Sequence, residues 1–475
     1  MGIDRKLRPQ SNSAWRNHLV LLGIILVGLV IRLGFLMIIA EYPDRGMRPD
    51  SESYLKPAIS LVSSGIYPPD NGKRPPMYPL FIALIYFLGG QNQVLIMAAQ
   101  ILLDTVTICL TYVLASRFFP RPVALVGALI MAINIDSITY DFYYLSETLS
   151  TFFTLVALLT WVKGNQEDRR GWLMIGALFM GLSVLTRPIT LYLPAVLICW
   201  RLFMRERPIR ERLIDAGAYA VTFLLILSPW VIRNYSVIGL PTVSTISHYN
   251  LLLFNAVSLE AEVRGVGEAQ VRREFLALQD RKLDELGLEK TPGNIARVQS
   301  MLGRDIILSH PFRYIYVHLK SDLNSLLPDT NILELLGMTT GGRGTLGVLK
   351  EKGLTEAVRH YFGDKTWLIG LLLPAITLLG FVYITGLIGF FQIIKDRNWL
   401  PFVVLVITSA YFLLLPGAPS IARFRVPVLP YLSILSSLGA YSIYQILMKR
   451  RRGKQENRLS HSRILEPEKK TLKQT

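Results

Sequence analysis

Cysteine is scarce in this chain of 475 residues, which has only Cys109 and Cys199, both inside apolar runs. Two such cysteines cannot form the disulfide framework of a small secreted domain, and they do not indicate a redox compartment. Metal-binding motifs are also missing, because His248, His310 and His318 lack the spacing of zinc ligands. The sequence therefore predicts neither a disulfide scaffold nor a histidine metal site.

Charged residues are few as well, at 18% of the chain, whereas 51% of residues are hydrophobic and the mean hydropathy is +0.38. This composition excludes a soluble globule that covers its own core, and it predicts a polytopic membrane protein. The net charge of +17 would suggest nucleic-acid binding in a soluble chain. Here most basic residues lie in short loops beside apolar runs, where they set orientation. We therefore expect no nucleic-acid partner.

Seven apolar runs are long enough to cross a bilayer as helices. They are 19–40, 93–116, 123–140, 142–162, 214–230, 366–394 and 426–448. The first run is too long for a signal-peptide core and is read as a span. The stretch 171–203 is divided at Arg187-Pro188 and is read as two crossings, because only then do the arginines after Trp200 lie inside. With the short run 400–415, about ten transmembrane helices are predicted.

The remaining segments complete an all-α architecture. We expect a cytoplasmic N-terminus at 1–18, an N-terminal transmembrane module at 19–233 with its first outer loop at 41–92, an extracytoplasmic segment at 234–365, C-terminal transmembrane helices at 366–448 and a disordered basic cytoplasmic tail at 449–475. Residues 78–88 are too few to cross and predict an interfacial helix. The outer segment is read as a lid over a membrane cavity, with 301–327 a helix lying on the membrane.

The same topology brings an unusual set of charged residues to the outer membrane surface. They are Asp50, Glu52, Lys73, Arg74, Asp141, Glu147, Arg187, Arg233, Arg423 and Arg425. Basic residues are disfavoured on this side by the positive-inside rule, so their presence suggests a ligand. One guanidinium group can bind two phosphate oxygens at once. The set therefore predicts a site for an anionic ligand at the outer face.

Structural roles are open for several of these residues. Asp50 and Glu52 could stabilise the start of a helix over 53–64, a role that we favour for Glu52 only. Glu147 could equally be an N-terminal charge on its span. Arg233, Arg423 and Arg425 could anchor helix ends at the lipid headgroups.

Four further residues are expected to be structural. Asp104, near the middle of the second span, is predicted to be a neutral or paired acid rather than a proton relay. Arg32 is expected to snorkel from the outer end of the first span. Tyr143 and Tyr144 are expected to belong to an aromatic belt at the membrane surface.

Six short motifs, taken in order, carry a family resemblance. They are RPDSESY (48–54), GKRPPMYPLFIAL (72–84), YYLSETL (143–149), GLSVLTRPITLYLP (181–194), PWVIRNY (229–235) and ARFRVPVLPYL (422–432). The series resembles the GT-C glycosyltransferases over roughly 19–447. It is closest to the protein mannosyltransferase and lipid A aminoarabinose transferase group and to the bacterial RgtA/B/C/D-like enzymes.

The resemblance implies a GT-C fold and transfer of a sugar from a polyprenyl-phosphate donor to a glycolipid, glycan or protein acceptor. The reaction would take place outside the cytoplasmic membrane. Asp50 matches the acid at the family's reaction centre, and a carboxylate there can take the proton of an attacking hydroxyl in an inverting displacement. Glu147 matches a second acidic position, and Arg74 matches the basic residue that neutralises the leaving phosphate.

The resemblance does not decide which of the remaining basic residues bind the phosphate or whether a metal ion is needed. Lys73 stands where the aminoarabinose transferase has a glutamate metal ligand, which leaves a divalent metal ion open, with Asp70 and Glu52 as substitute ligands. The further candidates for binding the phosphate are Lys73, Arg187, Arg233, Arg423 and Arg425.

Other classes of membrane protein stay open at this point. A lipid-linked-sugar transporter would be polytopic too, but it is expected to show internal repeats and midplane polar groups, and the sequence has no such repeat. A non-catalytic assembly protein would not explain the charges on one face. An O-antigen polymerase or ligase uses similar carriers on the same side, although the proline-rich segment after Asp50 favours the mannosyltransferase-like group.

Overall fold

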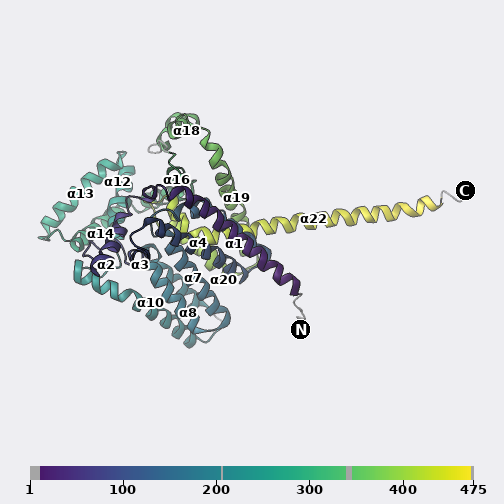
Figure 1. The fold of residues 1–475 in the computed structure, drawn as a ribbon, viewed down its shortest axis with the longest axis horizontal. Coiled ribbons are helices and arrows are strands. Elements are labelled where there is room, and N and C mark those ends of the chain that lie inside the picture. The colour runs from purple at the N-terminus through teal and green to yellow at the C-terminus, as the bar shows by residue number, and fades with distance from the viewer. Residues whose placement is uncertain (1–10, 205–206, 339–344, 472–475) are drawn as a thin grey trace.

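The computed structural model describes residues 11–204, 207–338 and 345–471, which form helices joined by turns and loops, with no β-strand among them (Figure 1). The predicted all-α fold is confirmed. Five of the described helices are long and apolar enough to cross a membrane: His18–Ile39, Gln93–Ser116, Ile209–Ile238, Leu368–Lys395 and Ala422–Arg452. Shorter apolar helices accompany them, and the number of ten spans stays a prediction.

The long helices form one bundle. Its members are α1 (Ser11–Ile39), α4 (Gln93–Ser116), α5 (Arg121–Ala132), α7 (Glu147–Glu167), α8 (Arg170–Val184), α9 (Leu193–Phe203), α10 (Ile209–Ile238), α19 (Leu368–Lys395) and α22 (Leu429–Thr471). The closest approach is between α19 and α22, where a Cβ added to Gly439 would lie 1.8 Å from the carbonyl oxygen of Thr385. Only glycine allows these two backbones to meet, as is common between membrane helices.

Two predicted spans are interrupted near their outer ends. The run 123–140 is divided into α5 and α6 (Ile135–Tyr140), because the Asn134 side chain accepts hydrogen bonds from the backbone N–H groups of Asp136 at 3.0 Å and Ser137 at 3.2 Å. This N-cap starts a new helix. The run 142–162 is helical only from Glu147, since 142–146 is a buried non-helical segment. Glu147 therefore begins a helix in the interior of the protein.

Two other segments contain the helices that the sequence predicted. The stretch 171–203 is divided, as predicted, into α8 and α9, with the short helix η2 (Pro188–Tyr192) between them. The helix predicted at 78–88 is α3 (Met77–Gly89), and its interfacial position stays a prediction. The short run near 400–415 consists of α20 (Trp399–Pro401), the π-helical turn η5 (Phe402–Ile407) and α21 (Thr408–Leu414).

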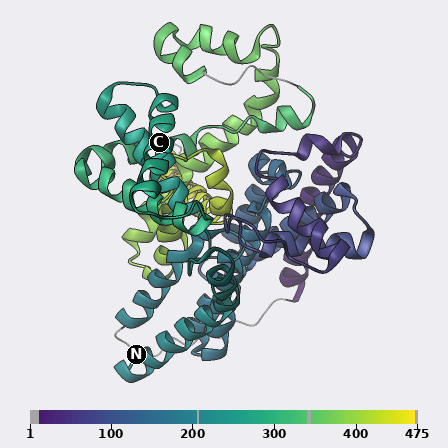
Figure 2. The same cartoon turned by 90° about the vertical axis from the view of Figure 1, so that its left-hand side faces the viewer.

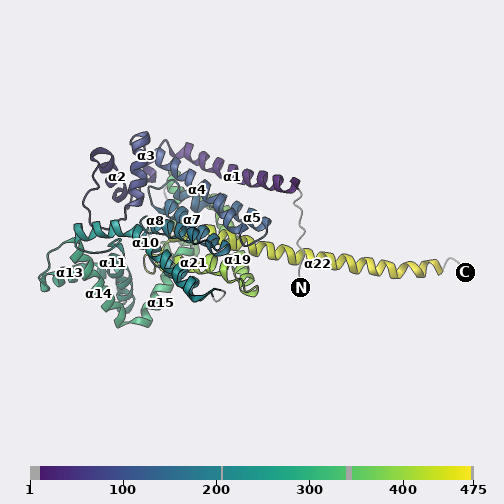
Figure 3. The same cartoon turned by 90° about the horizontal axis from the view of Figure 1, so that it is seen from below.

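The outer segment is a set of short helices. It contains α11 (Ile246–Asn250), η3 (Leu251–Ala256), α12 (Val257–Arg264), α13 (Glu268–Glu285), α14 (Pro292–Ser309), α15 (Pro311–Asp322), α16 (Asn331–Leu335), α17 (Thr345–Lys352) and α18 (Leu354–Phe362). Figures 1 and 3 place α13 and α14 at the end of the molecule opposite the C-terminal end of α22, and Figure 2 shows the green α17–α18 pair projecting from one edge. The single helix predicted over 301–327 is wrong, because Pro311 starts a new helix after Ser309.

The C-terminal tail differs from the prediction too. Instead of being disordered after Gly453, α22 continues as a helix to Thr471. The tail is rich in Arg, Lys, Glu, Gln and Leu, which are strong helix formers, so an existing helix can propagate through it. Of the predicted N-terminus 1–18, residues 1–10 lie outside the described part of the chain.

Candidate functional site

Two carboxylates and three guanidinium groups meet where the outer loops join the bundle. Nη1 of Arg423 donates to Oδ2 of Asp50 at 2.8 Å, and its Nε contacts Oε1 of Glu147. Nη2 of Arg74 contacts the other Asp50 oxygen, and Nη1 of Arg187 contacts the same Glu147 oxygen as Arg423. We call these five residues the acid–arginine cluster. The sequence predicted all five members from distant parts of the chain.

The two acids of the cluster differ in their exposure. The Asp50 side chain is 32% exposed, whereas that of Glu147 is completely buried. Both arginines that contact Glu147 use its Oε1, and Oε2 has no hydrogen-bond partner among the described residues. A buried carboxylate oxygen without a partner is costly. Oε2 of Glu147 is therefore available to a donor that enters the site.

Local structure fixes each member of the cluster. Asp50 precedes α2 (Glu52–Ser64), and Ser53 in its first turn accepts a hydrogen bond from Nε of Arg74 at 3.0 Å. Glu147 opens α7, where the helix dipole favours a negative charge. Arg187 is the extended residue before Pro188, a position from which helix is disfavoured. Breaks in regular structure thus aim these side chains at one point.

Glu52 takes the structural role that the sequence favoured. It lies in the first turn of α2 and pairs with Lys56 at 2.7 Å on the exposed surface. Asp70, the other proposed substitute for a metal ligand, pairs with Arg233 at 2.8 Å. No group of three or more His, Cys, Asp and Glu side chains lies close together in the described residues. Since Asp50 and Glu147 are already paired with guanidinium groups, these residues do not fit a carboxylate-bound divalent ion.

Lys73 and Arg233 lie beside the cluster without joining it. Nζ of Lys73 lies 4.7 Å from the centroid of the Tyr249 ring. Burial lowers the pKa of Lys73, the positive charge of Arg74 lowers it further, and the charge of Asp50 raises it only in part. The Arg233 guanidinium pairs with Asp70 and lies 4.6 Å from a ring centroid of Trp230, and neither acid of the cluster is among its contacts.

Arg425, a predicted candidate for binding the phosphate, lies outside the acid–arginine cluster. Its side chain is fully buried, and Nη2 pairs with Oδ2 of Asp136 at 2.6 Å. Nη1 donates to the carbonyl oxygens of Ser325 at 2.7 Å and Leu327 at 2.8 Å. These contacts tie the residues just before α22 to α6 and to the stretch 325–327 of the outer segment. Arg425 is therefore a structural residue, although it lies two positions from Arg423.

Asp329 provides a pH-dependent test of this buried region. Burial and the nearby charge of Asp136 raise the pKa of Asp329 to about 6, despite the hydrogen bond that its Oδ1 accepts from the Asn331 N–H at 2.9 Å. A carboxyl group whose pKa is raised by folding stabilises the folded protein at low pH. This contribution to stability is lost as the pH rises through the folded-state pKa. We expect Asp329→Asn to raise the melting temperature at about pH 8 and to leave it nearly unchanged at about pH 4. An equal change at both pH values, measured by thermal unfolding in detergent, would contradict this assignment.

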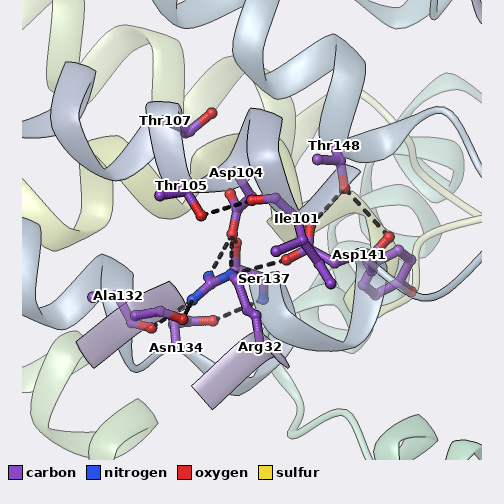
Figure 4. A network of polar contacts seen from close by, with 12 residues as sticks. Arg32, Ile101, Asp104, Thr105, Thr107, Ala132, Asn134, Ser137, Asp141 and Thr148 are labelled. Carbon is purple, nitrogen blue, oxygen red and sulfur yellow. Dashed lines mark hydrogen bonds and ion pairs between the residues drawn. The ribbon is translucent and has the colours of Figure 1, made fainter. Parts of the chain in front are cut away.

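A second polar network, shown in Figure 4, was missed by the sequence. Nε of Arg32 in α1 donates to Oδ2 of Asp104 at 3.1 Å and to Oδ2 of Asp141 at 2.9 Å. Asp104 also accepts from Ser137 Oγ at 2.7 Å, and Asp141 from Thr148 Oγ1 at 3.3 Å. Asp104 is thus a paired acid, as predicted. Arg32 does not snorkel and Asp141 is not at the surface, because both are fully buried.

The two tyrosines predicted for the aromatic belt are also buried. The Tyr143 hydroxyl donates to the carbonyl oxygen of Asn331 at 3.0 Å, and the Tyr144 hydroxyl donates to that of Pro43 at 2.8 Å. Both bonds join the non-helical segment before α7 to outer loops. The sequence could not show that these residues are buried, because charged or aromatic residues at the end of an apolar run fit a buried position and a membrane-surface position equally well.

An apolar cavity of about 640 Å³ opens beside the acid–arginine cluster. Its lining includes Tyr67, Met77, Leu185, Trp230 and Arg233. Met77 follows Arg74 by three residues and Leu185 precedes Arg187 by two, and the Met77 N–H donates to the Leu185 carbonyl oxygen at 3.0 Å. The chain segments 74–77 and 185–187 therefore each supply one residue to the cluster and at least one to the lining of the cavity.

Comparison with known proteins agrees with this picture. Residues 73–232 match the family of dolichyl-phosphate-mannose-protein mannosyltransferases. The resemblance to the protein mannosyltransferase group that the motifs predicted is confirmed over this range. The matched range contains Arg74, Glu147 and Arg187 of the cluster, whereas Asp50 and Arg423 lie outside it.

One solved structure supports the fold, and a second is reported beside it. The chain is similar to the apo oligosaccharyltransferase of Archaeoglobus fulgidus, with a TM-score of 0.52 and 13% identity over 94% of this chain and 52% of that one. Apo ArnT from Cupriavidus metallidurans gives a TM-score of 0.38 and 16% identity over 86% of this chain and 77% of that one. An uncharacterized protein of Aquifex aeolicus is 28% identical over 191 residues, 38% of either chain. The match to the oligosaccharyltransferase covers about half of that protein's length.

Proposed function

We propose that the protein transfers a sugar from a polyprenyl-phosphate donor to a glycolipid, glycan or protein acceptor at the outer face of the cytoplasmic membrane. The observation that carries the proposal is the acid–arginine cluster, which places a partly exposed carboxylate among guanidinium groups beside an apolar cavity. A lipid-borne sugar phosphate offers the three matching parts: an apolar chain, an anionic phosphate and an electrophilic anomeric carbon.

Asp50 acts as the general base in this mechanism. Burial alone would raise its pKa, but the charges of Arg74, Arg423 and Lys73 outweigh burial and hold the pKa below the ordinary value. Asp50 is therefore ionised at neutral pH and can accept the proton of an acceptor hydroxyl. The hydroxyl oxygen forms the new bond to the anomeric carbon as the bond to the phosphate oxygen breaks, and the phosphate leaves with that electron pair.

The arginines stabilise the charge that develops on the leaving phosphate. Arg74 and Arg423 both contact Asp50, and each is slightly exposed, at 13% and 16%. A phosphate that binds their free N–H groups weakens their hold on Asp50 and leaves its oxygens available to the hydroxyl. Arg187 and Glu147 keep Arg423 in place from the buried side. The free Oε2 of Glu147 is the second acceptor that can orient the attacking group.

The apolar cavity accommodates the first isoprene units of the carrier. We expect Leu80→Trp, which fills part of the cavity, to raise KM for the donor about tenfold and to leave kcat within about twofold. Leu84→Trp is the matched control, because Leu84 lies one turn further along α3, is 58% exposed and is not in the cavity lining. Equal kinetics of the two variants on one donor would exclude the cavity as the carrier site.

The proposal is tested by comparing glycolipids and glycoproteins by mass spectrometry from cells with and without the gene. We expect cells without it to accumulate a polyprenyl-phosphate sugar and to lack one sugar residue on one product. This measurement also identifies the sugar and the acceptor. Unchanged glycolipids and glycoproteins, with the carrier pool unaltered, would refute a glycosyltransferase.

A further inference from the structure

One face of α15 carries a row of exposed apolar side chains that no described part of the chain covers. The row begins at the end of α14 and continues past α15: Leu308, Phe312, Ile315, Tyr316, Leu319 and Leu323. From Phe312 onward, spacings of three and four residues put these side chains on one side of α15, and Leu308 lies near the end of the preceding helix α14. Phe312 is 86% exposed and Leu323 is 60% exposed. Such a patch marks an interaction surface rather than ordinary surface variation.

The location of α15 indicates what covers this row. Nε2 of His318 lies 2.8 Å from the carbonyl oxygen of Leu414, the last residue of the apolar helix α21. Just beyond α15, the carbonyl oxygen of Leu326 accepts from the Tyr383 hydroxyl in the membrane-spanning helix α19. Leu414 and Leu415 are themselves exposed. α15 therefore lies against the end of α21, beside the exposed Leu414 and Leu415.

Two basic residues flank this row at Tyr316, whose ring centroid lies 5.8 Å from Cζ of Arg313 and 5.3 Å from Nζ of Lys320. Arg313 and Lys320 both pair with Glu262 of α12, at 3.4 Å and 3.1 Å. Val317 and Asp322 are buried. A helix with an apolar face and a basic polar face lies at the boundary between lipid headgroups and acyl chains. We propose that α15 is a lipid-docked helix whose apolar row is buried in the outer leaflet.

Docking of α15 has a consequence for the cluster, which rests on the proposed function. Oδ1 of Asp322, at the end of α15, accepts from the Gly417 N–H at 2.8 Å, and Oδ1 of Asn255 accepts from that of Ala418 at 3.1 Å. This loop leads directly to Arg423, which bridges the two acids. The bilayer thus holds in place the loop that carries a phosphate-binding arginine.

The docking is tested without any activity assay. Cys109 and Cys199 are replaced by alanine in the full chain, and single cysteines are introduced as Phe312→Cys and Leu319→Cys. Leu276→Cys is the matched control, because Leu276 is an exposed leucine on α13, which Figure 1 places at the end of the molecule opposite the C-terminal end of α22. Each variant is labelled with a nitroxide in nanodiscs of phosphatidylethanolamine and phosphatidylglycerol, and collisions with oxygen and with a water-soluble nickel chelate are measured by electron paramagnetic resonance.

We expect the labels at 312 and 319 to collide with oxygen and to be protected from the nickel chelate, and the label at 276 to show the reverse. Equal access of the chelate to all three positions would overturn the proposal. Protection of 312 and 319 from both reagents would also overturn it, since that pattern means burial against another protein chain. An inactive protein that still shows the expected collisions would refute the glycosyltransferase and leave the docking intact.

Discussion

Asp50→Asn should lower kcat by about 10²–10⁴-fold, the usual contribution of a general base, and leave donor binding nearly unchanged. Asparagine keeps the size of the side chain and a carbonyl oxygen for Arg423, but it cannot take a proton. The measurement is steady-state transfer from a polyprenyl-phosphate sugar, together with the dissociation constant of the donor. We expect kcat to fall rather than donor affinity, because Arg74 and Arg423 hold Asp50 in place before the acceptor binds.

Glu52→Gln is the matched control for this variant. Glu52 lies two residues from Asp50, in the first turn of α2, but it is exposed and forms an ion pair with Lys56. Its substitution should leave kcat unchanged, because surface pairs of this kind contribute little. Full transfer by Asp50→Asn, or equal losses in the two variants, would remove Asp50 from the reaction.

Arg32→Met should be the most destabilising single substitution that the described structure suggests, at about 3–5 kcal/mol. Arg32 is the only basic partner that the buried acids Asp104 and Asp141 share. Methionine leaves both carboxylates in a membrane interior without a positive charge. The measurement is thermal or denaturant unfolding in detergent, with the fraction of protein inserted in the membrane as a second readout.

Asp141→Asn separates loss of charge from loss of packing at this network. It removes one acid but leaves the ion pair of Arg32 and Asp104 complete. We expect it to cost much less stability than Arg32→Met, at about 1 kcal/mol. If the two variants were equally stable, the buried charge would not be what makes Arg32 necessary.

The sequence predicted the acid–arginine cluster because two independent constraints agreed. The positive-inside rule placed the charged residues on one face, and the motifs gave Asp50, Glu147 and Arg74 their roles. Neither constraint required knowledge of helix packing. The family match over 73–232 and the contacts among the five residues agree with that placement.

The residues that the sequence misplaced depend on packing between distant helices. Arg423 and Arg425 lie two positions apart, yet one contacts Asp50 and the other is held by Asp136, more than 280 residues away. The partner of Arg32 in α1 is set by how α1 packs on α4. Hydropathy cannot show such partners, because a buried ion pair and a snorkelling arginine occupy the same kind of apolar run.

Helix ends were the other source of error. Asn134 caps α6 in the middle of an apolar run, and 142–146 leaves the helix although it is apolar and aromatic. The surrounding packing determines where both helices break, because the helix propensities of ordinary residues differ by less than about 1 kcal/mol. The second break matters for the site, because it places Glu147 at a helix start in the interior, where Glu147 joins the acid–arginine cluster.

The central claim is that the acid–arginine cluster transfers sugar from a lipid-borne phosphate. The most direct test incubates the purified protein in nanodiscs with the polyprenyl-phosphate sugar and the acceptor identified from cells, and follows both lipids by mass spectrometry. We predict that wild-type protein releases one polyprenyl phosphate for each sugar transferred, and that Asp50→Asn binds the donor without consuming it. Consumption of the donor at the same rate by both proteins, or by neither, would contradict the account.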